Sequence, residues 1–262
     1  MATVLKVFRY EARNVVRGKA LLGYLAFFFL STWGLIQFGG GVQRALPSLV
    51  SVTLLVVPLV SILMSVVGLY EGRDFTVLLL SQPVARPPLW AGRFLGFALP
   101  LVGAFLLGVG LPLAAGGTPA ELAGAVALLL TAGSLLTFSF VAMGFLVSVL
   151  VDEPAKGLGL ALIAWLAMTV IYDGGVLAVA QAFAHYPLER PMLVAMVLNP
   201  VDLARVTMLM ALDASALAGY TGAVFHEFFG GAVGLVVSLG SLLVWIALPY
   251  VLSLYRFRRQ DL

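Results

Sequence analysis

Residues 71–93 read EGRDFTVLLLSQPVARPPLWAGR and form the longest polar break in the first half of the chain, between two long apolar runs. Three charged residues open the break, and an apolar segment from Phe75 to Leu80 follows. Proline lacks an N–H and disfavours helix in the residue before it, so a helix begun here is expected to end before Pro83. The pattern predicts a short amphipathic helix at a membrane surface, held between two membrane spans.

The composition is that of an integral membrane protein. Of the 262 residues, 62% are hydrophobic and 10% are charged, whereas about 25% of the residues in soluble domains are charged. The mean hydropathy is +1.09. The apolar runs reach the roughly 20 residues that a helix needs to cross the hydrocarbon core, and the alternation of membrane β-barrels is missing. The sequence therefore predicts an all-α polytopic membrane protein.

Six spans are expected within one membrane domain over residues 1–262. They cover about 20–38, 47–69, 90–115, 119–151, 156–183 and 228–254. Residues 70–89 form the inner loop between the second and third spans, and residues 185–227 are too polar to span and form an outer helical segment. The fourth span is expected to start at a capping box made by Thr118 and Glu121, with Pro119 at the first helical position.

Residues 1–19 are expected to form an interfacial elbow helix before the first span. One stripe of this helix carries Lys6, Arg9, Arg13 and Arg17 for contact with anionic lipid headgroups, and another carries Leu5, Phe8, Ala12 and Val15 or Val16. The alternative is a plain basic flank of the first span.

Basic residues give the orientation. With the N-terminus inside, twelve of the 15 Lys and Arg residues lie in inner segments, and only Arg44, Arg190 and Arg205 lie outside. The positive-inside rule then places both termini in the cytoplasm. These basic residues sit at membrane edges, so no nucleic-acid partner is expected.

The polar break resembles the coupling loop of ABC type-2 exporter permeases. The resemblance rests on the carboxylate–glycine pair after a span, the Leu-Leu-Leu run, the following x-Pro, Arg86, and Gly92-Arg93; it departs at Asp74-Phe75, where the family usually has Gly-Thr. It implies a homodimer joined to two ATPase subunits, which bind the ATP and Mg, so that the permease has no cofactor and is not an enzyme. The alternative is an ordinary cytoplasmic loop. The residues expected to couple to the ATPase are Glu71, Arg73, Asp74, Phe75, Leu78, Leu79, Gln82, Pro83 and Arg86.

Asp173 is the acidic residue that lies well inside a predicted span, where a carboxylate costs about 2.5–3.5 kcal/mol on insertion scales. It is expected either to contact a protonatable substrate or to cap a helix break at Gly174-Gly175. An intramembrane aspartyl protease would need a second aspartate at the same depth. Around Lys19 the upstream glycine and the Ser or Thr of a phosphate-binding loop are missing. A stand-alone intramembrane enzyme or scaffold is therefore the remote alternative.

A metal site is considered near the outer segment. Thioether and imidazole ligands suit copper(I), but methionine is also common filler in apolar cores, so no metal ligand set is assigned. The candidate ligands are Met192, Met196, His185 and His226.

The outer segment contains Asn199-Pro200-Val201-Asp202, which predicts a helix from Pro200 to about Leu212 with Asn199 as its N-cap. Together with Arg205, this motif is similar to the corresponding segment of NosY-type permeases of bacterial inner membranes, which serve nitrous oxide reductase maturation. The resemblance implies a copper- or sulfur-related substrate and a periplasmic accessory protein. It also places Asn199, Asp202 and Arg205 on the outer surface that meets that protein. The alternative is a type-2 exporter of a lipid, drug or peptide.

Overall fold

The computed structural model describes residues 2–81, 85–183, 194–210 and 232–259, and these parts are α-helical with no strand among them. Six helices in the described residues are long and apolar enough to cross a membrane, which confirms the predicted all-α polytopic architecture. Several helices run a few residues beyond the expected spans, because polar residues continue the helix outside the hydrocarbon. The six cover Lys19–Gly39, Val42–Glu71, Arg86–Ala115, Ala120–Leu150, Pro154–Ala182 and Gly234–Arg259.

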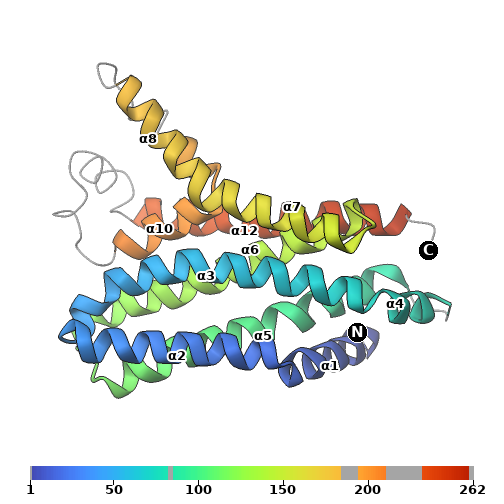
Figure 1. Cartoon of the computed structure of the whole chain (residues 1–262), viewed down its shortest axis with the longest axis horizontal. Coiled ribbons are helices and arrows are strands. Elements are labelled where there is room, and N and C mark those ends of the chain that lie inside the picture. The colour runs from blue at the N-terminus through green and yellow to red at the C-terminus, as the bar shows by residue number, and fades with distance from the viewer. Residues whose placement is uncertain (1, 82–84, 184–193, 211–231, 260–262) are drawn as a thin grey trace.

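The core is a bundle of helices that lie lengthwise beside one another (Figure 1). In each of α3, α5 and α6, half or more of the residues in the apolar membrane-spanning stretch are buried, so these three helices form the centre of the bundle. Fully buried aromatic side chains fill the interior of the bundle, among them Phe28 of α2, Phe105 of α5 and Phe140 of α6. The bundle helices are α2 (Lys19–Gly39), α3 (Val42–Glu71), α5 (Arg86–Ala115), α6 (Ala123–Leu150) and α12 (Ala232–Arg259).

Helix α1 (Ala2–Arg17) packs along the first half of α5. A Cβ at Gly96 would lie 2.5 Å from the Glu11 Cβ, and one at Gly92 would lie 2.8 Å from the Val7 Cβ. The Gly92-x-x-x-Gly96 ridge therefore allows the two backbones to approach closely.

The expected stripes of α1 are partly wrong. Leu5 and Val16 are exposed, whereas Val7, Glu11 and Val15 form the buried stripe. The burial of a carboxylate was not expected from hydropathy, because only its ion pair with a second helix makes it possible. The basic side chains Lys6, Arg9, Arg13 and Arg17 are exposed as predicted.

The two ends of the bundle carry different elements. The short helix α4 (Arg73–Leu80), α1 and both chain termini lie at one end (Figure 1), as an even number of spans requires. Helix α10 (Pro200–Met210) lies at the other end, where it packs against α6, α12 and α3.

The fifth span is a composite of α7 (Pro154–Leu166), the π-helical turn η2 (Ala167–Ile171) and α8 (Tyr172–Ala182). Figure 1 shows α7 lying along the bundle and α8 leaving it beyond η2. Only 6% of the residues in the apolar stretch of this span are buried, the smallest share among the six spans of the described residues. A π turn inserts one extra residue into a helix and changes its direction, which the hydropathy pattern does not reveal.

The capping box predicted at Thr118 is wrong. A 3₁₀ turn, η1 (Ala120–Leu122), precedes α6, and no side chain caps it. The Thr118 hydroxyl instead donates to the Leu113 carbonyl at 2.7 Å and so closes the end of α5.

Candidate functional site

Helix α4 is amphipathic, as the polar break predicted. It begins after Gly72 and ends at Leu80, before the expected stop at Pro83. Leu79 and Leu80 pack against the core, whereas Leu78 is 58% exposed. Glu71, Asp74 and Ser81 are also exposed. One face of α4 is thus free for a partner at the end of the bundle that holds both termini.

Two of the expected coupling residues anchor α4 to its own chain. The Arg73 guanidinium lies 2.6 Å from the Asp152 carboxylate and donates to the Asp152 carbonyl at 2.9 Å. The Phe75 ring stacks on Tyr10 of α1 with a centroid distance of 4.5 Å. The other face of α4 is therefore tied to α1 and to the turn between α6 and α7. Gln82 and Pro83 lie outside the described residues.

Arg86, at the start of α5, binds the end of α12. Its Nη1 donates to the carbonyls of Phe257 and Arg258 at 3.0 and 2.9 Å. The last carbonyls of a helix lack internal donors and carry partial negative charge, so a guanidinium is a suitable partner there. One turn further along α5, the Trp90 indole donates to the Ser253 hydroxyl at 2.9 Å. The start of α5 is thereby fastened to the last helix.

A buried ion pair between Arg93 and Glu11 was missed by the sequence reasoning. The Arg93 Nε lies 2.6 Å from the Glu11 carboxylate, and both side chains are almost fully buried. The available signal was that Glu11 is the only acidic residue before Glu71 and falls between Val7 and Val15 on one helical stripe. A pocket of about 40 Å³ beside Arg93 is large enough for water and far below the roughly 300–1,000 Å³ of pockets for drug-sized ligands.

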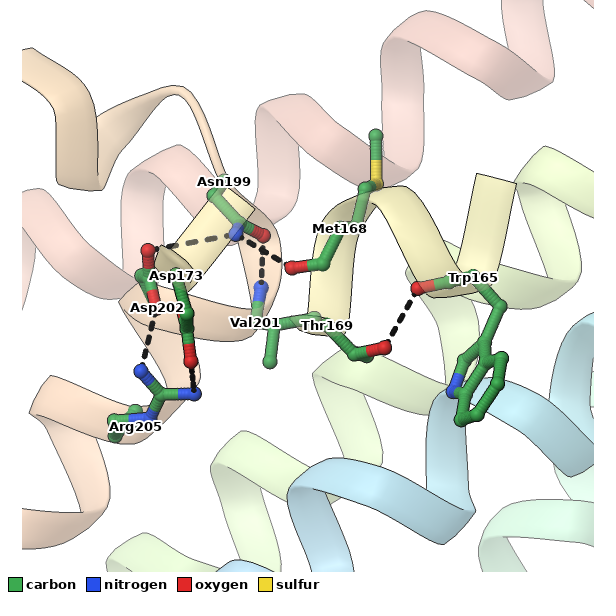
Figure 2. Close-up of polar contacts among 8 residues, drawn as sticks. All are labelled: Trp165, Met168, Thr169, Asp173, Asn199, Val201, Asp202 and Arg205. Atoms are coloured by element: carbon green, nitrogen blue, oxygen red, sulfur yellow. Dashed lines mark hydrogen bonds and ion pairs between the residues drawn. The ribbon is translucent and has the colours of Figure 1, made fainter. Parts of the chain in front are cut away.

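At the opposite end, Asn199 caps α10 as predicted. Its Oδ1 accepts from the Val201 N–H at 2.9 Å, and Pro200 occupies the first helical position. Figure 2 shows the other side of this amide, where Nδ2 donates to the Met168 carbonyl of η2 at 2.8 Å. Asn199 therefore joins the start of α10 to the π turn of the fifth span.

Arg205 lies between two carboxylates (Figure 2). Its Nη1 donates to Asp202 Oδ1 at 2.9 Å, and its Nη2 donates to Asp173 Oδ2 at 2.6 Å. Asp173, in the α8 part of the fifth span, therefore pairs with α10. Helix α8 runs without a break through Gly174-Gly175, so the prediction that Asp173 caps a helix break there is wrong. We call Asp173, Asn199, Asp202 and Arg205 the outer cluster.

Burial changes the electrostatics of the outer cluster. Burial and the neighbouring Asp173 charge raise the pKa of Asp202 to about 7, although Arg205 and Asn199 oppose the shift. Asn199 is 1% and Asp202 6% exposed. The expectation that these two are surface residues is therefore corrected: they hold α10 in place. A cavity of about 150 Å³ borders Arg205, between α3, η2 and α10.

The candidate metal ligands are mostly outside the described residues. His185, Met192 and His226 lie outside the residues that the structure describes. Met196 lies in a short helical turn before α10. Among the described residues, no three His, Cys, Asp or Glu side chains gather in a way that could hold a metal ion. No metal ligand set is therefore assigned, and Met192, Met196, His185 and His226 stay candidates from the sequence.

Comparison with known proteins identifies the family of the chain. Residues 52–262 match the family described as ABC-2 family transporter protein. The chain is 30% identical to the "Probable ABC transporter permease protein NosY" of Pseudomonas aeruginosa over 237 residues, which covers 84% of this chain and 86% of that protein. It is 27% identical to the protein of the same name in Stutzerimonas stutzeri over 292 aligned positions, which cover 99% of both.

Proposed function

Since the chain belongs to the ABC-2 family of ABC transporter permeases, we propose that it is the membrane subunit of an ATP-driven exporter whose ATPase is a separate subunit. The exposed face of α4 around Leu78 carries this proposal, because the opposite face is fastened to the chain by Arg73 and Phe75. A helix free on one side and anchored on the other can receive a load from a soluble partner. ATP and Mg bind that partner, and both termini are cytoplasmic.

The working unit is a homodimer with two ATPase subunits in the inner membrane. Among the described residues, most of the apolar surface of the fifth span is uncovered, including Ile163, Ile171 and Leu177. A second copy and lipid together would cover this surface. ATP-driven closure of the ATPase pair would bring the two α4 helices together, and Pro58, Pro100 and Pro249 inside the spans are positions where helices bend.

The substrate proposed is a copper- or sulfur-related species for copper-centre maturation of nitrous oxide reductase, delivered with a periplasmic accessory protein. The resemblance to NosY-type permeases over nearly the whole chain supports this. The cavity beside Arg205 measures about 150 Å³, whereas pockets for drug-sized ligands measure about 300–1,000 Å³. A cargo that enters this cavity would therefore have to be smaller than a drug-sized molecule.

Co-purification with the ATPase subunit tests the permease proposal. Leu78→Asp places a charge on the exposed face of α4 and is expected to abolish most of the association while the permease still folds. Leu198→Asp is the matched control, because Leu198 is 60% exposed, close to the 58% of Leu78, and precedes α10, the helix at the other end of the bundle. Equal association of both variants and the unmodified chain would overturn the proposal.

Complementation tests the substrate. The chain is expressed in a denitrifying host that lacks its own NosY-type permease, together with its ATPase subunit. The expected result is nitrous oxide reductase with a full complement of copper. A reductase that stays copper-deficient while the permease–ATPase complex assembles would reject this cargo and leave the exporter assignment intact.

A further inference from the structure

Arg93 contacts three other helices from within α5. Besides the Glu11 carboxylate of α1, its Nη1 donates to the Thr76 hydroxyl of α4 at 2.5 Å, and its Nη2 reaches the Gly68 carbonyl of α3 at 3.4 Å. The guanidinium is a rigid planar fork, so its three nitrogens fix the relative positions of the groups that they bind. A single side chain therefore connects α1, α3, α4 and α5.

The backbone leaves space for this connection. A Cβ at Gly72, the residue before α4, would collide with the Arg93 guanidinium, and a Cβ at Gly96 would lie 2.5 Å from the Glu11 Cβ. Two glycines thus keep open the positions where the Arg93–Glu11 pair lies. The small pocket beside Arg93 is far below the size of pockets for drug-sized ligands, so the arrangement serves contacts within the chain.

Thr76 receives the Arg93 contact on the inward side of α4. It is buried, while Leu78, two residues later and therefore about 200° around the helix, is exposed. A load applied at the exposed face is directed toward Thr76. The second polar tie of α4, between Arg73 and Asp152, is largely exposed to solvent, and exposed ion pairs hold elements together weakly.

We propose that Arg93 is a positioning residue that passes the displacement of α4, through Thr76, to Glu11 and the elbow helix α1. The coupling helix and the elbow helix then move as one body with the start of α5. A buried ion pair often stabilises a fold no more than apolar side chains of similar size would. Stability alone therefore does not explain the Arg93–Glu11 pair, whereas a mechanical connection between α4 and α1 does. The inference rests on the proposed function, which supplies the ATP-driven displacement of α4.

Distance measurements between spin labels test the connection in the full permease–ATPase complex. The chain has no cysteine, so Ser81→Cys at the end of α4 and Asn14→Cys on α1 each give one labelled site per copy, and both positions are exposed. The distance between the two copies is measured by pulsed electron paramagnetic resonance without nucleotide and with ATP and vanadate. In the otherwise unmodified chain, both the α4 and the α1 distances are expected to change.

Thr76→Val removes the hydroxyl between Arg93 and α4 but leaves the Arg93–Glu11 pair. We expect the α4 distance to change as before and the α1 change to become smaller, since the stacking of Phe75 on Tyr10 is then the remaining side-chain contact described between α4 and α1. Thr76→Ser restores the hydroxyl and with it the α1 change. Arg93→Lys cannot reach Glu11 and Thr76 in the same geometry and is expected to reduce the α1 change in the same way.

Each outcome is decisive. If the unmodified chain shows no α4 change, the proposed function fails before the inference is reached. If it does, and Thr76→Val leaves the α1 change at full size, the inference is overturned. Loss of both changes in Thr76→Val would also overturn it, because Thr76 would then be needed to receive the load rather than to pass it on.

Discussion

Arg205 of α10 lies 2.6 Å from Asp173 of α8, although 32 positions separate them in the chain, and at the same time it binds Asp202 at 2.9 Å. One guanidinium thus binds two carboxylates, and its single positive charge cannot neutralise both of them when both are ionised. Asp202 is the more buried of the two. The three charges do not contribute equally to the stability of the fold. Leaving the buried carboxylate of Asp202 without its cation is far more costly than leaving the partly exposed carboxylate of Asp173 without it.

Arg205→Ala is therefore expected to destabilise the protein more than Asp173→Asn. The arginine variant leaves both carboxylates without their cation. Because the Arg205 side chain is 34% exposed, the variant should cost about 2 kcal/mol, less than the roughly 3–5 kcal/mol of fully buried pairs. Asp173→Asn leaves Arg205 bound to Asp202 and should cost about 1 kcal/mol. Thermal unfolding in detergent gives the order. Adding Asp202→Asn to Arg205→Ala should recover part of the loss, and equal losses in the two single variants would contradict this hierarchy.

Stability should also depend on pH through Asp202. Its pKa is raised from 3.8 to about 7 in the folded protein, so the folded state keeps a proton that the unfolded state has already lost. The folded state then binds more protons between these values, and stability falls as pH rises through this window. We expect the melting temperature to decrease from about pH 5 to pH 7 and then to level off.

Asp202→Asn is the control for this pH dependence. The amide keeps the shape of the side chain and carries no charge, so the slope between pH 5 and pH 7 should flatten. An unchanged slope in this variant would assign the pH dependence to another group.

Local patterns predicted much of the fold. Long apolar runs gave the six spans, because a helix must be apolar throughout its passage across the hydrocarbon. The end of α4 followed from the missing N–H of Pro83, and the start of α10 followed from Asn199 and Pro200. In each case the physical cause acts within a few residues of the chain, so a single sequence contains it.

Pairings between distant helices were not predictable in this way. Glu11 and Asp173 are both balanced by arginines from other helices, and periodicity within one helix does not tell which helix will face it. Asn199 and Asp202 were placed at the surface because polar residues are usually exposed. The structure buries them because η2 supplies a carbonyl to Asn199 and α10 supplies Arg205 to Asp202.

The close contact between α1 and α5 can be tested with two glycines of α5. Gly96→Ala would bring a methyl group to about 2.5 Å from the Glu11 Cβ and should cost about 1–3 kcal/mol, as overpacking usually does. Gly103→Ala meets no atom within 4 Å and should be neutral or stabilising by up to about 1 kcal/mol, since alanine favours helix. Similar melting temperatures for both variants would contradict the close approach.

Labelling of single cysteines tests the orientation of the bundle. Ser81 is exposed at the end of α4, and Ala120 is exposed in the turn between α5 and α6 at the other end. In intact cells, a membrane-impermeant maleimide should label Ala120→Cys and not Ser81→Cys, and in inverted vesicles the pattern should reverse. The unmodified chain has no cysteine and supplies the blank. If Ser81→Cys were labelled from outside, α4 would face the periplasm, where a cytoplasmic ATPase cannot contact it. The proposed coupling role of Leu78 would then be wrong.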